Sequence, residues 1–308
     1  MKLIHAANEL APGNQICLAI GVFDGVHLGH QQIIRQTVAD ARQHDALALV
    51  ITFDRHPNTV VAPDRVPPLI HSLPQKLRAI ESLGTDTLLQ IHFDEPFSRQ
   101  TGEDFIRGLA RDLGRIRSVC VGADFVFGHQ RSGNVALLKK LGDEFAFAVH
   151  GLAAVSLDGQ IVSSTRIREA IRSGDLDAAS QMLGRPYAIS GRVIEGDRVG
   201  RQLGFPTANL DAAGLVLPPN GVYAGLTGVG KSFHHVALNI GFRPTVVSAV
   251  PQLRVEAHLL DFNGDLYGQE LEIEVGDRLR DEKKFASAME LREQIGRDID
   301  RVRRAGGS

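Results

Sequence analysis

The stretch ICLAIGVFDGVHLGHQQIIRQTVADAR, residues 16–42, decides how the first half of the chain folds. The apolar run ICLAIG predicts a strand, the glycine-rich segment after it predicts a turn, and HQQIIRQTVADAR has helical character. The same order recurs, and one later helix opens near Thr101 with TGED, which has the spacing of a capping box. The strand-like runs are ICLAIG, LALVITF, DTLLQIHF, IRSVCVG and FAFAVH. This alternation predicts parallel strands covered by helices, with ligands at the carboxyl ends of the strands.

The pattern changes near residue 184, where strands of period two begin. AISGRVIEG, LRVEAHLLDF and ELEIEV alternate apolar and polar residues, and Asn263-Gly264 between the last two predicts a hairpin. The segment SAMELREQIGRDIDRVRR predicts a C-terminal helix. We therefore expect an α/β domain over residues 1–183, followed by a small antiparallel β-barrel domain over residues 184–308 that is closed by a helix.

Composition narrows the class of protein. The chain has 308 residues, of which 43% are hydrophobic and 23% charged, with a net charge of −2, so it is expected to be globular, soluble and cytoplasmic. Lys and Arg are interspersed with Asp and Glu, and no apolar run has the length of a membrane span, which argues against nucleic acid and membrane partners. Cys17 and Cys120 lie in apolar runs and are expected to be buried thiols without a disulfide or zinc.

The segment GLTGVGKS, residues 225–232, matches the G-x-x-x-x-G-K-[ST] pattern of a phosphate-binding P-loop. A P-loop is followed by a helix, because the helix N-terminus completes the phosphate site. After Ser232, however, Val236, Leu238 and Ile240 alternate as in a strand. We therefore favour a glycine-rich turn between two antiparallel strands and expect phosphate binding elsewhere.

A second glycine-rich segment, GVFDGVHLGHQ at residues 21–31, follows the first predicted strand. Its glycines allow a ligand to approach the backbone closely, and His27 and His30 share a face where a helix begins. Two imidazoles and a helix N-terminus suit an anion such as a triphosphate. Two capping histidines without a ligand, or a metal pair, are the alternatives.

Motifs along the whole chain resemble one enzyme family. H-x-G-H after the first strand resembles the signature of nucleotidyltransferases with a Rossmann-like fold. TFDRHP, VGADFVFG and VSSTRIREAI narrow the resemblance to the adenylyltransferase module of bacterial bifunctional riboflavin kinase/FAD synthetases. GDRVGRQLGFPTANL at 196–210 resembles the riboflavin kinase motif, followed in the family's order by GVYAG, NIGFRPTV, VEAHLLDFNGDLYG and LRDEKKF. The resemblance implies that the second module uses ATP and Mg²⁺ to phosphorylate riboflavin to FMN, and that the first adenylylates FMN to FAD with release of pyrophosphate.

In the second module, Thr207 and Asn209 stand two apart in an extended segment, so their oxygens face the same way and suit Mg²⁺. Glu256 lies on the polar face of LRVEAHLL, where most glutamates are simply solvated; the family pattern implies that it is the general base. The resemblance also assigns Tyr267 to the nucleotide. Three side chains are implied to contact flavin or phosphate: Arg280, Lys283 and Phe285. Four residues are expected to fold over or fix the nucleotide site: Gly196, Gly200, Gly204 and Pro206.

In the first module, the FMN phosphate attacks the α-phosphorus, so catalysis needs positioning and charge stabilisation rather than a protein nucleophile. The resemblance implies that His27, His30 and Arg166 act catalytically. The residues implied to bind nucleotide are Gly21, Phe23, Asp24, Gly25, His27, His30, Asp124, Ser163, Ser164, Thr165, Arg166 and Arg168. Those implied to pack near flavin are His56, Phe125 and Phe127. Because Arg166 and Arg168 are two apart, either both lie at a helix start or one is structural.

Two positions depart from the family pattern: Val22 stands where many members have Asn, and Arg55 where Pro is frequent. Neither removes a phosphate-binding group. Two other functions stay open, an adenylyltransferase acting on another phosphate ester, such as phosphopantetheine or nicotinamide mononucleotide, and a flavin-binding protein without catalysis. The barrel with GFPTAN argues against the first, and the retained polar residues argue against the second.

Overall fold

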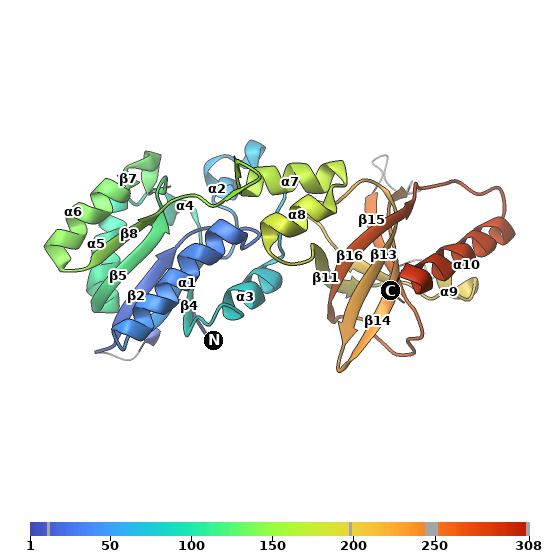
Figure 1. The fold of residues 1–308 in the computed structure, drawn as a ribbon, viewed down its shortest axis with the longest axis horizontal. Coiled ribbons are helices and arrows are strands. Elements are labelled where there is room, and N and C mark those ends of the chain that lie inside the picture. The colour runs from blue at the N-terminus through green and yellow to red at the C-terminus, as the bar shows by residue number, and fades with distance from the viewer. Residues whose placement is uncertain (11–12, 197–198, 244–251, 306–308) are drawn as a thin grey trace. The chain divides into compact units, whose positions relative to one another are not determined.

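The structure is a computed structural model that describes residues 1–10, 13–196, 199–243 and 252–305. The chain divides into two compact units, Met1–Ser164 and Thr165–Ser308, which we describe separately (Figure 1). This division falls before the boundary expected between residues 183 and 184, because the contacts group most of α7 (Ser164–Ser173) and all of α8 (Leu176–Leu183) with the barrel. Residues 244–246 of NIGFRPTV and 197–198 of GDRVG lie outside the described residues.

The first unit is built on a six-stranded sheet of order β1-β4-β3-β2-β5-β8, in which every neighbouring pair is parallel. Its strands are β1 (Lys2–Ile4), β2 (Gln15–Ile20), β3 (Leu47–Phe53), β4 (Thr87–Ile91), β5 (Arg115–Gly122) and β8 (Ala148–Leu152). After β2 the chain moves to β3 and β4 on one side, and then returns to β5 and β8 on the other. The strand order therefore reverses between β2 and β5, and ligands of such sheets bind at the carboxyl ends beside this reversal.

Helices cover both faces of this sheet, as the alternation of strands and helices predicts. α1 (Leu28–Gln43) and α3 (Leu73–Glu81) pack on one face, and α5 (Gly102–Leu113) and α6 (Val135–Phe145) on the other. The unit also contains the short helices α2 (Asn58–Val61) and α4 (Glu95–Ser98) and the 3₁₀ helices η1 (Ala7–Glu9), η2 (Pro63–Arg65) and η3 (His129–Arg131). Two short hairpins complete the unit, β6 (Val126–Phe127) with β7 (Gly133–Asn134) and β9 (Ser156–Leu157) with β10 (Gln160–Ile161).

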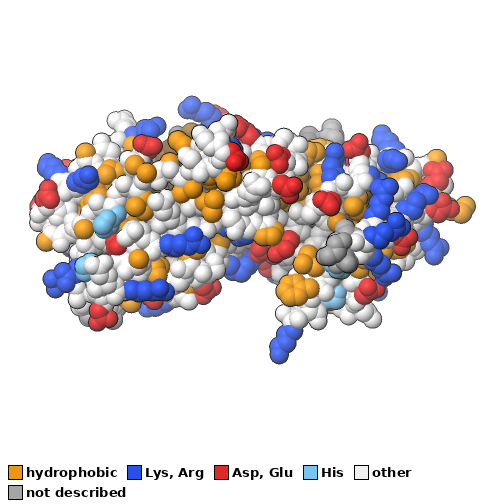
Figure 2. Space-filling view, viewed as in Figure 1, with side chains coloured by type: hydrophobic (Ala, Val, Ile, Leu, Met, Phe, Trp, Pro, Cys, Tyr) orange, Lys and Arg blue, Asp and Glu red, His pale blue; other side chains and the backbone are white. Residues whose placement is uncertain are grey.

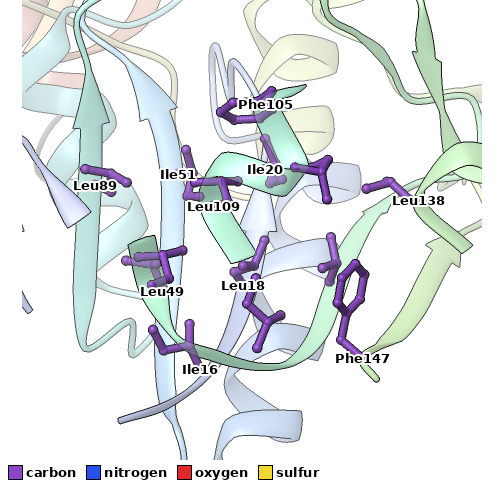
Figure 3. Close-up of a cluster of buried hydrophobic side chains, with 14 of the residues drawn as sticks. Ile16, Leu18, Ile20, Leu49, Ile51, Leu89, Phe105, Leu109, Leu138 and Phe147 are labelled. Carbon is purple, nitrogen blue, oxygen red and sulfur yellow. The ribbon is translucent and has the colours of Figure 1, made fainter. Parts of the chain in front are cut away.

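The strand residues alternate between two cores. Ile16, Leu18 and Ile20 of β2 pack with α5 and α6 residues such as Leu109 and Leu138 (Figure 3). Ala19 between them packs on the other face, in a cluster with residues of α1 and α3. This period of two is why a parallel strand reads as a continuous apolar run: both of its faces are buried.

Two details of the first unit differ from the sequence-based expectation. The predicted strand FAFAVH begins only at Ala148, because Phe145 ends α6 and Ala146 takes the left-handed conformation (φ 60°) that terminates the helix. The edge strand β1 was not predicted, since three residues are too short to show a period. The Thr101 hydroxyl does cap α5, accepting the Asp104 N–H at 3.1 Å.

The second unit contains a closed barrel of order β11-β12-β15-β14-β13-β16, all antiparallel. Its elements are β11 (Ala188–Ile194), α9 (Val199–Gln202), β12 (Ala208–Asp211), β13 (Gly221–Val229), β14 (Ser232–Arg243), β15 (Gln252–Leu259), β16 (Glu270–Arg280) and α10 (Ala288–Ala305). Val255, Ala257 and Leu259 of β15 point into the barrel and are buried. α10 is the expected C-terminal helix, and its Ile299 and Val302 pack in a cluster with Ala224 of β13.

The segment GLTGVGKS forms a hairpin and not a P-loop. Val229 of β13 pairs with Ser232 of β14, and Gly230 and Lys231 form the turn between them, with Gly230 at φ +62°. The hairpin predicted at Asn263-Gly264 is wrong. The strands on either side of it are not neighbours, because β15 pairs with β12 and β14 whereas β16 pairs with β11 and β13. Barrel closure thus overrides the local turn signal.

Candidate active sites

The loop after β2 brings His27 and His30 together. His27 is the N-cap of α1, and its Nδ1 accepts the His30 N–H at 3.4 Å. The two imidazole rings stack with centroids 3.6 Å apart and planes inclined by 21°. Phe23 supports the pair through an edge contact with the His30 ring, with centroids 5.3 Å apart. The loop therefore presents two parallel imidazoles at the start of a helix, beside the point where the strand order reverses.

This loop is held in an unusual backbone conformation. Phe23 and Val26 have φ values of 51° and 39°, which non-glycine residues rarely adopt. A Cβ on Gly21 would lie 2.8 Å from the Phe23 ring, and one on Gly25 would lie 3.0 Å from Ile70. Glycines at these two positions are therefore required by close packing, consistent with their place in the motif.

The surroundings of His30 keep its imidazole neutral. Burial lowers the pKa of His30 well below 6.5, and the nearby His27, Lys76 and His71 lower it further. His30 Nδ1 is buried and has no hydrogen-bond partner among the described residues. A neutral imidazole interacts with phosphate as a hydrogen-bond donor, and not as a cation.

Asp24 faces the protein backbone. Its carboxylate accepts the N–H groups of Ile70, at 3.0 and 3.2 Å, and of His71, at 3.3 Å. The Asp24 carbonyl accepts the Ser164 hydroxyl at 3.0 Å, which anchors the first residue of α7 to this loop. The structure therefore places Asp24 as a bridge between three segments of the site.

Two polar residues after β3 have local partners. The Nδ1 atom of His56 accepts the Asn58 N–H at 3.1 Å. Arg55 lies 3.4 Å from Asp54, whose carboxylate also contacts His92 Nδ1 at 2.6 Å. Arg55, at the departure from the family pattern, is thus part of a small charge network at the ends of β3 and β4.

The GADFVFG segment after β5 contributes aromatic rings. Phe125 and Phe127 stack with ring centroids 5.1 Å apart and planes inclined by 16°, and both are half-buried. Asp124 beside them is exposed. Phe127 continues into the core through an edge contact with Phe105, with centroids 6.3 Å apart. Two partly exposed parallel rings form a surface suited to stacking with a flat heterocycle.

The SSTRIR motif opens α7. Ser163 precedes the helix, and Thr165 is exposed. Arg166 lies in the first turn and is half-buried, whereas Arg168 is 8% exposed. The two guanidinium groups therefore have different surroundings, although both lie near the helix start.

In the barrel, register aligns three polar side chains across neighbouring strands. Glu256 of β15 pairs with Asn209 of β12 on one side and with Asn239 of β14 on the other. Opposed residues share a face, and Val255 and Ala257 on either side of Glu256 point inward. The three polar groups therefore form a row on the outer face of the barrel. Asn239, within the quoted NIGFRPTV stretch, was not named by the sequence argument because only the register brings it to Glu256.

A cavity of about 350 Å³ lies over Glu256 and Asn239 of this row, whereas Asn209 does not line it. Most of the predicted kinase residues line it, together with apolar side chains of α10. The lining includes Gly200, Thr207, Asn239, Glu256, Arg280, Lys283 and Phe285, as well as the unpredicted Arg254, His258 and Glu282.

A second cavity of about 560 Å³ is lined by Asn209, by Asp211 at the end of β12 and by residues 212–215 after it. Arg254 lines both cavities. The loop before β12 packs closely against the side chains of Thr207 and Asn209. A Cβ on Gly196 would lie 2.8 Å from Asn209 Oδ1, and one on Gly200 would lie 3.3 Å from Thr207 Oγ1. These two glycines therefore allow the loop to pack against the two predicted Mg²⁺ ligands.

Arg280 is fixed in the smaller cavity by a buried ion pair. Its Nε lies 2.9 Å and its Nη2 2.8 Å from Asp298 Oδ2, and Asp298 is only 3% exposed. The Arg280 guanidinium also lies over the Phe285 ring, 5.8 Å from the centroid. Asp298 thus orients a cation and, through it, an aromatic ring at the cavity.

Basic side chains gather on the barrel unit near α10 (Figure 2). Arg297, Arg301 and Arg304 share one face of α10 and, with Arg280 and Lys283, line a hollow of about 510 Å³. Such a concentration of positive charge attracts anionic substrates towards the adjoining cavity.

Four predicted residues line neither of these two cavities: Gly196, described above, Gly204, Pro206 and Tyr267. Tyr267 is 46% exposed in the connection between β15 and β16. Gly204 has φ +91° and shapes the turn before β12. The Pro206 carbonyl accepts a hydrogen bond from the His258 Nδ1–H at 2.7 Å.

The two sites define a two-domain transferase, and comparisons with known proteins agree. Residues 11–166 match the family model of FAD synthetase, and residues 183–305 match that of riboflavin kinase. The chain is 39% identical over 301 residues to the bifunctional riboflavin kinase/FMN adenylyltransferase of Escherichia coli K12, covering 97% of this chain and 96% of that one. It is 38% identical over 299 residues to the protein of the same name from Haemophilus influenzae, covering 96% of each.

The chain therefore belongs to the bifunctional riboflavin kinase/FMN adenylyltransferase family. Its C-terminal domain phosphorylates riboflavin to FMN, and its N-terminal domain adenylylates FMN to FAD, as the resemblance in the sequence implied.

A crystal structure of a macrolide-efflux protein from Streptococcus pneumoniae is similar over 98% of both chains, with a TM-score of 0.81 and 28% identity. In the part of this chain that the structure describes, none of the helices combines the length and apolar character needed to cross a membrane.

Proposed function

We propose that phosphoryl transfer takes place at the row formed by Asn209, Glu256 and Asn239. Glu256 is the general base, and it accepts the proton of the ribityl 5′-hydroxyl as the oxygen attacks the γ-phosphorus of ATP. The observation that carries this proposal is the register, which puts the Glu256 carboxylate on the outer face beneath the 350 Å³ cavity, one strand away from Asn209.

We propose that the two cavities of the barrel hold the two substrates. The smaller is lined by Phe205, Phe285 and Ile295, which suit the flat flavin ring, and it contains Glu256. The larger borders Asn209 and suits ATP. Arg254 lines both, so its guanidinium can contact the phosphoryl group as it passes from one to the other.

The donors fit Mg²⁺ as the cofactor of this reaction. Thr207 and Asn209 offer neutral hard oxygens, and Mg²⁺ in kinases is held by few protein ligands together with substrate phosphates and water. The close approach of Gly196 to Asn209 and of Gly200 to Thr207 fixes the backbone on which both ligands lie. When bound, the cation neutralises charge on the ATP phosphates.

In the N-terminal domain, we propose that His27 and His30 hold the triphosphate of ATP while the FMN phosphate attacks the α-phosphorus. The stacked rings at the N-terminus of α1 provide N–H donors, and the helix dipole favours the negative charge. From the family resemblance, we propose that the hydroxyls and guanidinium groups of the SSTRIR motif also bind nucleotide, and that Arg166 stabilises the charge that develops.

We propose that the flavin of FMN stacks near Phe125 and Phe127, with His56 nearby and Asp124 on the nucleotide. Asp24 contributes through the backbone that it holds, since its carboxylate already accepts two N–H groups. We propose that the ligands of the whole chain are ATP, riboflavin, FMN and FAD. We also propose that the protein is cytoplasmic and that the functional boundary between its domains lies at residues 183/184.

One experiment tests the kinase assignment. Pure protein is incubated with ATP and Mg²⁺ and either riboflavin or FMN, and the flavins are separated by chromatography. Glu256→Gln is expected to lower FMN formation about 10²- to 10⁴-fold, because a general base contributes that much. FAD formation from FMN serves as the internal control and should be unchanged. An unaltered rate of FMN formation would show that Glu256 is only a solvated surface residue.

A further inference from the structure

Lys76, on α3, is a buried charged residue that none of the motifs includes. It is 8% exposed, and its ammonium contacts three protein oxygens: Phe53 O at 2.7 Å, Thr52 Oγ1 at 3.3 Å and Val22 O at 3.4 Å. An ammonium has three N–H donors, so all three are occupied within the protein. This leaves no donor for a substrate.

The three acceptors lie at the carboxyl ends of β2 and β3. Thr52 and Phe53 end β3, and Val22 lies in the loop that carries His27. The Thr52 hydroxyl also donates to Val22 O, at 3.1 Å. Lys76 therefore connects the histidine-bearing loop to the neighbouring strand at the edge where the ligand binds.

The same loop contains the left-handed residues Phe23 and Val26. Backbone in such conformations persists only where the surrounding structure holds it. Val22 directly precedes this strained segment, and Asp24 within it is held by the backbone at Ile70 and His71. Lys76 thus fixes the entrance to the segment whose far end positions the two histidines.

We propose that Lys76 is a positioning residue for adenylyl transfer: by binding the Val22 and Phe53 carbonyls, it holds the loop that places His27 and His30. The inference rests on the proposed roles of these histidines. Lys76 acts through the loop and does not contact the reacting atoms.

The electrostatic surroundings make this role dependent on pH. Burial lowers the pKa of Lys76 to about 8, although the carboxylates of Asp24 and Asp54 oppose the shift. A neutral amine has two donors for three acceptors, so the connection weakens above that pH. The other titratable groups around Lys76 are Arg55, His56 and His71, which line the same small cavity, and His30, whose pKa it lowers.

Lys76→Met in the full chain tests the proposal. We expect the turnover for FAD formation from FMN to fall about 10²-fold, as a small misplacement of catalytic groups costs, with the KM for FMN within twofold of the parent. FMN formation from riboflavin, catalysed by the barrel of the same chain, should be unchanged. The matched control is Lys140→Met, which removes an exposed lysine of α6 and should leave both reactions unchanged.

The pH profile separates positioning from general support of the fold. In the parent, kcat/KM for FAD formation should decline above about pH 8, and this decline should be absent in Lys76→Met. If Lys76→Met does not fold, Thr52→Val removes one acceptor with little change of shape and should lower FAD formation about tenfold, short of the 10²-fold cost of a full misplacement.

Three results would overturn the inference. In a folded Lys76→Met variant, these are FAD formation within twofold of the parent, an equal loss of FAD and FMN formation, or the same decline of kcat/KM above about pH 8 as in the parent. Failure of the parent to make FAD from FMN would instead contradict the proposed function.

Discussion

The ion pair between Arg280 and Asp298 allows a quantitative prediction for the barrel domain. Asp298→Asn keeps the shape of the side chain but leaves the Arg280 guanidinium without its counter-charge. Removing one partner of a buried pair costs about 3–5 kcal/mol. Arg280 keeps its hydrogen bond to the Asp281 carbonyl at 2.9 Å, and its side chain is 13% exposed, so the cost should be near the lower limit, about 3 kcal/mol.

For a unit of this size, about 4 °C in Tm corresponds to 1 kcal/mol, which gives a decrease of about 12 °C. Calorimetry of the full chain measures the unfolding transition. Because Arg280 also orients Phe285 at the smaller cavity, the KM for riboflavin should rise, whereas FAD formation from FMN should not change.

The matched control is Asp300→Asn, which neutralises an exposed carboxylate two residues further along the same helix. It should change the free energy of unfolding by less than about 0.5 kcal/mol. If Asp298→Asn proved as stable as Asp300→Asn, the pair would contribute nothing to the barrel, and the reasoning from its burial would be refuted.

Two further predictions concern the kinase loops. Lys231→Ala should change stability by less than about 0.5 kcal/mol and leave the KM for ATP unaltered, because Lys231 lies in an exposed hairpin turn. Thr207→Ala should weaken Mg²⁺-dependent ATP binding. If folded Lys231→Ala and Thr207→Ala lost FMN formation equally, the hairpin assignment would be contradicted. Gly196→Ala should lower FMN formation about 10²-fold, because the new Cβ displaces the Asn209 amide. The control is Gly228→Ala, because a Cβ on Gly228 would lie 3.6 Å from its nearest neighbour, the Phe233 ring. A similar loss of FMN formation in both variants would count against a role for the contact between Gly196 and Asn209.

The sequence predicted the positions of the strands better than it predicted which strands pair. LALVITF coincides with β3, and ICLAIG, DTLLQIHF and IRSVCVG match β2, β4 and β5 to within two residues, because strands buried on both faces are continuously apolar. FAFAVH is the exception, since it begins three residues before β8. Local signals failed where a distant partner decides: Asn263-Gly264 has the composition of a hairpin, but barrel closure inserts other strands between β15 and β16.

The candidate sites divide in the same way. By itself, the sequence determined the family, the two-domain order and the motif residues such as His27, His30, Thr207 and Glu256, since these are short patterns of residue type and spacing. Only the tertiary structure placed Asn239 beside Glu256 and Lys76 beneath the histidine loop. The physical reason is that a side chain's partners across a sheet, and the burial that shifts its pKa, depend on strand order and register, and these are set by packing between segments distant in the chain.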